Sequence, residues 1–386
     1  MEKKPELSIV MPCLNEAETL AICIEKAKRF LENNQVEGEI IIADNGSTDG
    51  SQKIAESLNA RVIPVKEKGY GSALRGGIEA ANGTYIIMAD ADDSYNFEAL
   101  LPFLTNLRSG SDLVMGNRFK GGVAKGAMPF LHKYLGNPVL SFIGRLFYKI
   151  NIGDFHCGLR GFSKEAYYKM DLKTTGMEFA SEMIVKSKLN NLKITEVPTT
   201  LQPDGRTRDP HLNTWRDGWR HLRFLLLYSP QWLFLIPGLF LIVIGFISSV
   251  VIISQPIVID NIHLDIHTLL YTSSFVLIGF QFIVFYALTK IYAVENKLLP
   301  KSNRYNKLFK YLNLETGLII GVLFLIVGIV LSYFGLNIWK HSNFGELNPS
   351  ETLRIIIPAV FTILLGMQII FFSLFFSILG LKNSDN

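Results

Sequence analysis

Four long apolar stretches in the carboxyl-terminal part of the chain constrain its fold more than any other feature. They cover about residues 232–253, 269–290, 316–336 and 355–381, and no Asp, Glu, Lys, Arg or His occurs in them away from the ends. A helix needs ~20 residues to cross a hydrocarbon core of ~30 Å. We therefore predict a membrane domain over 231–386 with four transmembrane helices. Ionisable residues inside a membrane usually mark ion or proton pathways, so their absence argues against a coupled transporter.

The first 230 residues carry most of the charged side chains and alternate short β-branched runs with helical segments. Strands are predicted at 7–11, 39–43, 61–65, 85–89 and 112–115, and helices near 16–33, 49–58, 71–81 and 96–108. This alternation predicts an α/β domain over 1–210 with a mostly parallel sheet covered on both faces. The apolar run at 7–11 is too short for a signal peptide, and we interpret it as the first strand.

Composition and cysteine content exclude several classes of protein. A net charge of +4 is too weak to indicate a nucleic-acid partner, and a hydrophobic content of 49% excludes a disordered chain. The three cysteines, Cys13, Cys23 and Cys157, lack the spacing of a zinc site. We therefore expect reduced thiols in a cytoplasmic compartment.

The loop after the second apolar stretch is basic. It contains one acid, Glu295, and five cations: Lys297, Lys301, Arg304, Lys307 and Lys310. Because Lys and Arg are enriched in cytoplasmic loops, this loop, both termini and the polar domain are predicted to lie on the cytoplasmic side of an integral membrane protein.

The segment 211–230, between the two domains, has the pattern of an amphipathic helix. Two tryptophans and a leucine recur at helical spacing, with three arginines beside them: Trp215, Trp219, Leu222, Arg216, Arg220 and Arg223. We interpret this segment as an interfacial helix in the lipid headgroup layer. The alternative is a linker helix packed on the polar domain. Residues 132–150 are a second candidate for the membrane surface.

Acidic and polar side chains directly follow three of the predicted strands. These segments are Pro12-Cys13-Leu14-Asn15-Glu16, Asp44-Asn45-Gly46-Ser47-Thr48-Asp49-Gly50 and Asp90-Ala91-Asp92-Asp93-Ser94. Ligands of parallel sheets bind at the carboxyl ends of the strands. Two aspartates in a D-x-D motif repel each other unless a cation lies between them, and their hard oxygens suit Mg²⁺ or Mn²⁺ that also binds substrate phosphates. We therefore predict that Asp90 and Asp92 hold a metal and a nucleotide diphosphate. The alternatives are that both aspartates cap a helix and that Asp44 only forms a turn.

These segments, taken with three others, resemble a known family. The others are G-Y-G-S-A-L-R-G-G at 69–77, G-N-R-F at 116–119, and D-F-H-C-G-L-R-G-F at 154–162 with E-V-P at 196–198. In order and spacing they resemble the inverting glycosyltransferases of family two, in the branch of dolichyl-phosphate mannose and glucose synthases and bactoprenol glucosyltransferases. The resemblance covers residues 7 to about 225. It implies a nucleotide-diphospho-sugar transferase fold.

The resemblance also implies roles for individual residues. The nucleotide sugar is expected at seven positions: Pro12, Asn15, Glu16, Asp44, Gly71, Arg75 and Asp90. Asp92 is expected to act in catalysis with two cations near the phosphates, Arg118 and Arg160. Many relatives have Gln where this chain has Ser94, so Asp93, Ser94 and the substrate alone remain open as the third metal ligand.

Three cations precede the amphipathic segment, at positions suited to bind the phosphate of a lipid acceptor: Arg206, Arg208 and His211. They are alternatively surface cations that bind anionic lipids. A phosphate monoester has a second pKa near ~6 and is largely ionised at neutral pH, so it needs no dedicated general base.

We therefore predict an enzyme that transfers a hexose, with inversion, from a nucleotide diphosphate sugar to a polyprenyl phosphate at the cytoplasmic membrane face. The resemblance favours glucose and UDP. One alternative is a membrane glycosyltransferase with a glycan or protein acceptor; the Q-x-x-R-W motif common in processive members is absent. Another is a non-catalytic nucleotide sensor that binds or flips lipids. Glycines in the apolar stretches are compatible with a homo-oligomer.

Overall fold

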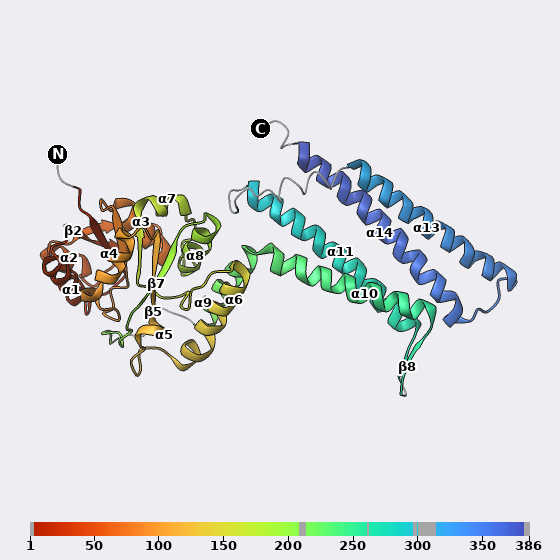
Figure 1. Ribbon diagram of the computed structural model, residues 1–386, viewed down its shortest axis with the longest axis horizontal. Coiled ribbons are helices and arrows are strands. Elements are labelled where there is room, and N and C mark those ends of the chain that lie inside the picture. The colour runs from red at the N-terminus through yellow and green to blue at the C-terminus, as the bar shows by residue number, and fades with distance from the viewer. Residues whose placement is uncertain (1–3, 208–213, 261, 296–298, 300–313, 382–386) are drawn as a thin grey trace. The chain divides into compact units, whose positions relative to one another are not determined.

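The computed structural model describes residues 4–207, 214–260, 262–295, 299 and 314–381 (Figure 1). The chain divides into two compact units, Met1–Leu227 and Tyr228–Asn386. The first unit is an α/β domain, and the second consists mainly of long apolar helices. Each unit is described by itself below.

A seven-stranded sheet forms the centre of the first unit, in the order β3-β2-β1-β4-β6-β5-β7. The strands are β1 (Leu7–Cys13), β2 (Gly38–Asp44), β3 (Arg61–Pro64), β4 (Tyr85–Met88), β5 (Leu113–Asn117), β6 (Arg160–Ser163) and β7 (Ile194–Pro198). The pairs within β1 to β4 and the pair β5–β7 are parallel, whereas β6 runs antiparallel to both of its neighbours. The predicted mostly parallel sheet is confirmed.

Helices cover both faces of this sheet because successive strand side chains point to opposite faces. Ile9 and Met11 of β1 belong to a buried cluster with α1 (Leu20–Asn33) and α4 (Leu101–Arg108). Val10 faces α3 (Tyr70–Ala80), where a Cβ on Gly77 would lie 2.7 Å from Val10 Cγ1. Glycine therefore allows α3 to approach the sheet closely and fixes its amino end beside the strand ends.

The remaining helical elements of this unit connect the strands and cover its edges. They are α2 (Ser51–Ser57), η1 (Phe97–Ala99), α5 (Arg118–Gly121), η2 (His132–Gly136), α6 (Asn137–Tyr148), α7 (Lys164–Met170), α8 (Phe179–Leu189) and α9 (Thr214–Leu227). The Tyr148 hydroxyl donates to the carbonyl oxygen of Leu225 at 2.8 Å, which joins the ends of α6 and α9.

Two predicted helices differ from the observed ones. The helix expected at 16–33 begins at Leu20, because the preceding turn is held by the Glu16 amide, which donates to Ser51 Oγ, and by the Thr19 hydroxyl, which donates to the Ala91 carbonyl. The helix expected at 96–108 is split into η1 and α4, and Pro102 lies in the first turn of α4, where a missing N–H costs little. The first of these breaks lies beside the turn after β4 that carries acidic residues.

The second unit contains four helices that are long and apolar enough to cross a membrane, as predicted. They are α10 (Ile236–Ser254) with the preceding turn η3 (Gln231–Leu235), α11 (Ile266–Glu295), α13 (Leu314–His341) and α14 (Pro349–Leu381). A short hairpin of β8 (Ile257–Ile259) and β9 (Ile262–Leu264) joins α10 to α11. The five cations of the basic loop on which the orientation argument depends lie outside the described residues.

Glycines allow the apolar helices to pack in pairs, seen as long adjacent rods in Figure 1. A Cβ on Gly279 of α11 would lie 2.6 Å from the Gly238 carbonyl oxygen of α10. A Cβ on Gly366 of α14 would lie 2.7 Å from the Gly321 carbonyl oxygen of α13. In lipid, where burial of apolar surface gives little preference for helix contact, such close backbone approach is a main source of association.

Candidate functional site

The site begins where the loops after β1 and β2 are tied together. Asn15 adopts a left-handed conformation with φ of 59°, which turns the chain out of β1. Its amide donates to Ser47 Oγ at 2.9 Å, and its Oδ1 accepts from the Thr48 amide at 2.8 Å. The predicted nucleotide residues after these two strands therefore lie together at one edge of the sheet.

Asp44, at the end of β2, is almost wholly buried. Its Oδ2 accepts from the side-chain amide (Nε2) of Gln52 at 2.6 Å and from the backbone amide of Gly46 at 3.1 Å. Its Oδ1 accepts from the backbone amide of Ser47 at 3.2 Å. The carboxylate thus shapes its own loop, as the turn interpretation expects. Its hydrogen bonds also fix its position beside the end of β1, which includes Pro12.

The turn after β4 places Asp90 and Asp92 at the same edge. Asp90 Oδ1 accepts from the Tyr70 hydroxyl at 2.9 Å, which connects this carboxylate to the start of α3. Asp92 Oδ1 accepts from the amide and the hydroxyl of Ser94, at 3.1 and 2.6 Å. Desolvation and then the charge of Asp92 raise the pKa of Asp90 to about 6. Burial of the carboxyl is the main cause, and the positive charges of Arg206 and Arg118 lower the pKa only in part.

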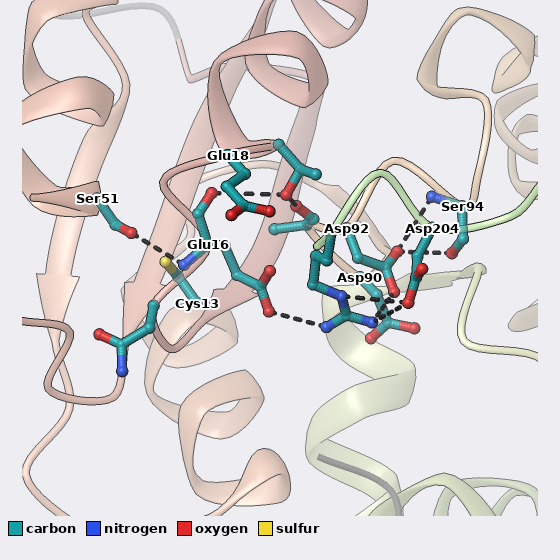
Figure 2. A network of polar contacts seen from close by, with 12 residues as sticks. Cys13, Glu16, Glu18, Ser51, Asp90, Asp92, Ser94 and Asp204 are labelled. Atoms are coloured by element: carbon teal, nitrogen blue, oxygen red, sulfur yellow. Dashed lines mark hydrogen bonds and ion pairs between the residues drawn. The ribbon is translucent and has the colours of Figure 1, made fainter. Parts of the chain in front are cut away.

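Arg206 supplies the main cation at this edge, from a segment far along the chain. Its guanidinium donates to Asp92 Oδ2 at 2.8 Å, to Glu16 Oε1 at 3.1 Å and to Asp204 Oδ2 at 2.9 Å. Figure 2 shows the carboxylates of Glu16, Asp92 and Asp204 converging on one place. The predicted acceptor-phosphate residue Arg206 therefore lies against the predicted metal ligand Asp92. Arg208 and His211 lie outside the described residues.

The two predicted catalytic arginines have protein partners of their own. Arg118 Nε and Nη2 donate to the two carboxylate oxygens of Asp154 at 2.7 and 2.8 Å. Arg160 is fully buried, and its guanidinium donates to the carbonyl oxygens of Phe155, Cys157 and Ala180. Both guanidinium groups hold the loop before β6 in place. Their expected action on phosphates stays a prediction.

Gly71 and Arg75 lie on α3 but in different surroundings. A Cβ on Gly71 would lie 2.7 Å from the Thr174 carbonyl oxygen, so glycine is needed for the loop before α8 to pack there. Arg75 Nη2 donates to Glu67 Oε2 at 2.7 Å in a partly exposed pair. Gly71 thus belongs to the wall of the site beside Tyr70, whereas Arg75 is engaged at the surface.

The donor set fits a divalent cation held by two carboxylates and completed by substrate oxygens. Across the described parts of the chain, no group of three or more His, Cys, Asp or Glu side chains is arranged to hold a metal. Asp93 pairs with Lys26 at 2.6 Å, and the Ser94 hydroxyl donates to Asp92. These contacts favour substrate, over Asp93 and Ser94, as the source of the remaining ligands. Mg²⁺ commonly binds through one or two carboxylates together with phosphates.

Glycine next to Asp90 supports this fit. A Cβ on Gly158 would lie 2.5 Å from Asp90 Oδ2 and 3.3 Å from the Tyr95 hydroxyl. The Tyr95 hydroxyl accepts from the Gly158 amide at 2.8 Å. The loop before β6 therefore approaches the Asp90 carboxylate as closely as a residue without a side chain permits.

Sequence reasoning missed several residues of the site: Glu18, Tyr70, Tyr95, Asp154 and Asp204. Asp204 stands two positions before Arg206, and Tyr70 begins the helix after β3, but neither position has a local pattern that indicates a carboxylate or arginine partner. Thr207 likewise donates from its amide and its hydroxyl to Glu18, both at 2.7 Å. Only the folded chain brings these groups together.

Comparison with known proteins adds family matches for both units. Residues 8–171 match the model of glycosyl transferase family 2, and residues 287–380 match the glycosyltransferase family 2 C-terminal transmembrane region. A low-salt glycan biosynthesis hexosyltransferase, Agl6 of Haloferax volcanii, is 38% identical over 97% of this chain and 89% of the relative. A dolichyl-phosphate hexose transferase of the same organism is 28% identical over 50% of this chain and 81% of the relative.

Among solved structures, glucosyl-3-phosphoglycerate synthase from Mycobacterium tuberculosis, in complex with Mn²⁺, uridine diphosphate and phosphoglyceric acid, is 21% identical with a TM-score of 0.46. The alignment covers 58% of this chain and 78% of that chain.

Proposed function

Because the chain belongs to glycosyl transferase family 2, we propose that it transfers a hexose, with inversion, from a nucleotide diphosphate sugar to a polyprenyl phosphate. UDP-glucose is the favoured donor, and the reaction takes place at the cytoplasmic face of the membrane. The family membership and the hexosyltransferase relative support the reaction class. The dolichyl-phosphate hexose transferase relative supports the acceptor class.

One observation carries the proposal: the Asp90 and Asp92 carboxylates lie at the same sheet edge as the tied loops of Asn15 and Asp44. The loops after β1 and β2 offer hydrogen-bonding groups to a base and ribose. We propose that the two aspartates bind the diphosphate of the same donor. The order of these groups matches the order of parts in a nucleotide diphosphate sugar.

In the proposed inverting transfer, different residues bind the metal and orient the donor. Asp90 and Asp92 would hold Mg²⁺ or Mn²⁺, which supplies positive charge to the departing diphosphate. Asn15, Asp44 and their partners orient the donor, and orientation alone is worth a large part of a rate enhancement. The acceptor phosphate arrives already ionised at neutral pH, so the site needs no general base.

Exposed apolar side chains on α6 and α9 support binding of the first unit to a bilayer surface. Trp215 and Trp219 of α9 are 80% and 58% exposed, and Phe142 and Leu146 of α6 are 56% and 42% exposed. Arg216 and Arg220 are also on α9. Amphipathic helices with this mixture of aromatic and cationic side chains lie in the headgroup layer. We propose that both helices do so, on the cytoplasmic side.

The test uses purified full-length protein in detergent with a polyprenyl phosphate and a radiolabelled nucleotide sugar. We expect radioactivity in the organic phase that mild acid releases, and we expect Asp92→Asn to abolish it. Glu98→Gln, which removes a carboxylate of an exposed ion pair, is the matched control and keeps the activity. Label in an aqueous polymer or on protein would refute the lipid acceptor. Undiminished activity of Asp92→Asn would refute the metal assignment.

A further inference from the structure

The segment from Gln202 to Thr207 is fixed across the acidic edge of the sheet. The Gln202 amide donates to the Ser94 carbonyl oxygen at 3.0 Å, and the Gly205 amide donates to the Asp92 carbonyl oxygen at 2.9 Å. Thr207 is held by Glu18. Backbone contacts on both sides of Arg206 therefore hold its side chain against the turn that carries the aspartates.

The guanidinium of Arg206 lies against the turn after β4, where the divalent metal is proposed to bind. Only 13% of its side chain is exposed, and three carboxylates surround it: Glu16, Asp92 and Asp204. Asp92 Oδ1 is already engaged by Ser94, so the contact to Arg206 occupies its other oxygen. A metal ion that binds Asp92 through Oδ2 has to displace the guanidinium.

We propose that Arg206 is the resident counter-cation of Asp92, which competes with the divalent metal and couples metal binding to binding of the donor diphosphate. In the protein without donor, Arg206 occupies the Asp92 carboxylate and weakens its affinity for metal. When metal and donor bind together, Arg206 leaves Asp92 and donates to the diphosphate. The inference rests on the proposed function, since it takes the Asp pair as the metal site.

The energetics favour such an exchange. An arginine and a carboxylate in a largely desolvated site form a strong charge-assisted contact, so the free protein keeps it without a ligand. A diphosphate offers the guanidinium a new bidentate partner of higher charge. Only molecules in which Arg206 has left Asp92 are competent to bind the metal. The apparent metal affinity is therefore the intrinsic affinity multiplied by the fraction of molecules in that state. If about one molecule in ten is competent, the apparent affinity is ~tenfold weaker.

The test measures Mn²⁺ binding to the full-length protein by electron paramagnetic resonance of the free ion, without nucleotide. We expect Arg206→Met to bind Mn²⁺ at least ~tenfold more tightly than the wild type. Lys26→Met is the matched control, because it removes a cation that pairs with Asp93 at 2.6 Å and not with Asp92. We expect Lys26→Met to change the affinity less than ~threefold, since it acts only through the general electrostatic field.

Two further variants separate the possible outcomes. Arg206→Gln keeps a hydrogen-bonding group for Glu16 and Asp204, and it replaces Arg206→Met if that protein does not fold. An affinity of the Arg206 variants equal to that of the wild type, or to that of Lys26→Met, would overturn the proposal. Asp92→Asn reports on the proposed function alone: if it binds Mn²⁺ as the wild type does, the metal assignment fails, whatever the Arg206 variants show.

Discussion

Removal of the Asp154 carboxylate would test whether Arg118 is held by the protein or available to substrate. Asp154 is fully buried, and it accepts from the Arg118 amide at 3.1 Å as well as from the guanidinium. Asp154→Asn leaves the guanidinium without a counter-charge, and breaking a buried pair in this way costs about 3–5 kcal/mol. For a domain of this size, 1 kcal/mol lowers Tm by roughly 2–4 °C. We therefore expect the first unit to unfold roughly 10 °C lower.

Glu98→Gln provides the control, because it removes the same charge from an arginine pair of nearly the same length. Arg29 Nε lies 2.6 Å from Glu98 Oε1, but the two side chains are 48% and 45% exposed. Exposed pairs contribute about 0–1 kcal/mol, so Tm is expected to change by at most roughly 4 °C. Scanning calorimetry of the full chain measures both shifts, and hydrogen exchange in β5 identifies the transition of the first unit.

Equal shifts for Asp154→Asn and Glu98→Gln would refute the reasoning. They would mean that Arg118 is solvated in the native protein and gains little from Asp154. The sequence-based prediction that Arg118 binds substrate phosphate would then be favoured over a positioning role. A large shift confined to Asp154→Asn would instead show that substrate has to compete with a carboxylate for this guanidinium.

Three other perturbations have defined outcomes. Burial lowers the pKa of His221 from 6.5 to about 4. Because the unfolded chain then binds a proton more readily than the native protein, the free energy of unfolding is unaffected by His221 above pH ~6.5 and falls by about 3 kcal/mol as the pH approaches 4. His221→Gln should flatten this pH dependence in calorimetry. Gly158→Ala forces a Cβ against Asp90 Oδ2, and we expect hexosyl transfer to fall on the order of tenfold to a hundredfold in the radiolabel assay while the protein remains folded. Dialysis against a chelator should abolish transfer and Mn²⁺ or Mg²⁺ should restore it; full activity after chelation would contradict the metal assignment.

Local patterns in the sequence predicted much of the fold because each depends on neighbouring residues. The runs that became β1 to β5 have the β-branched composition of buried strands, and the apolar stretches are long enough to span a membrane. The antiparallel strand β6 was not predicted. It is four residues long, contains Arg160 and Gly161, and owes its place to pairing with β4 and β5. Its sequence, Arg-Gly-Phe-Ser, has no β-branched residue, so it lacks the signal that indicated the other strands.

The same distinction applies to the site. Asp90, Asp92 and Asp44 follow strands directly, so the rule that ligands bind at the carboxyl ends of strands was enough to find them. Arg206 and Asp92 are separated by 114 positions, and no local pattern indicates their contact. The sequence predicted Arg206 as a cation for the acceptor phosphate, and this stays a prediction, compatible with the observed position if the guanidinium changes partners. In the proposed exchange Arg206 has two anionic partners, of which the sequence predicted the phosphate and the structure describes Asp92.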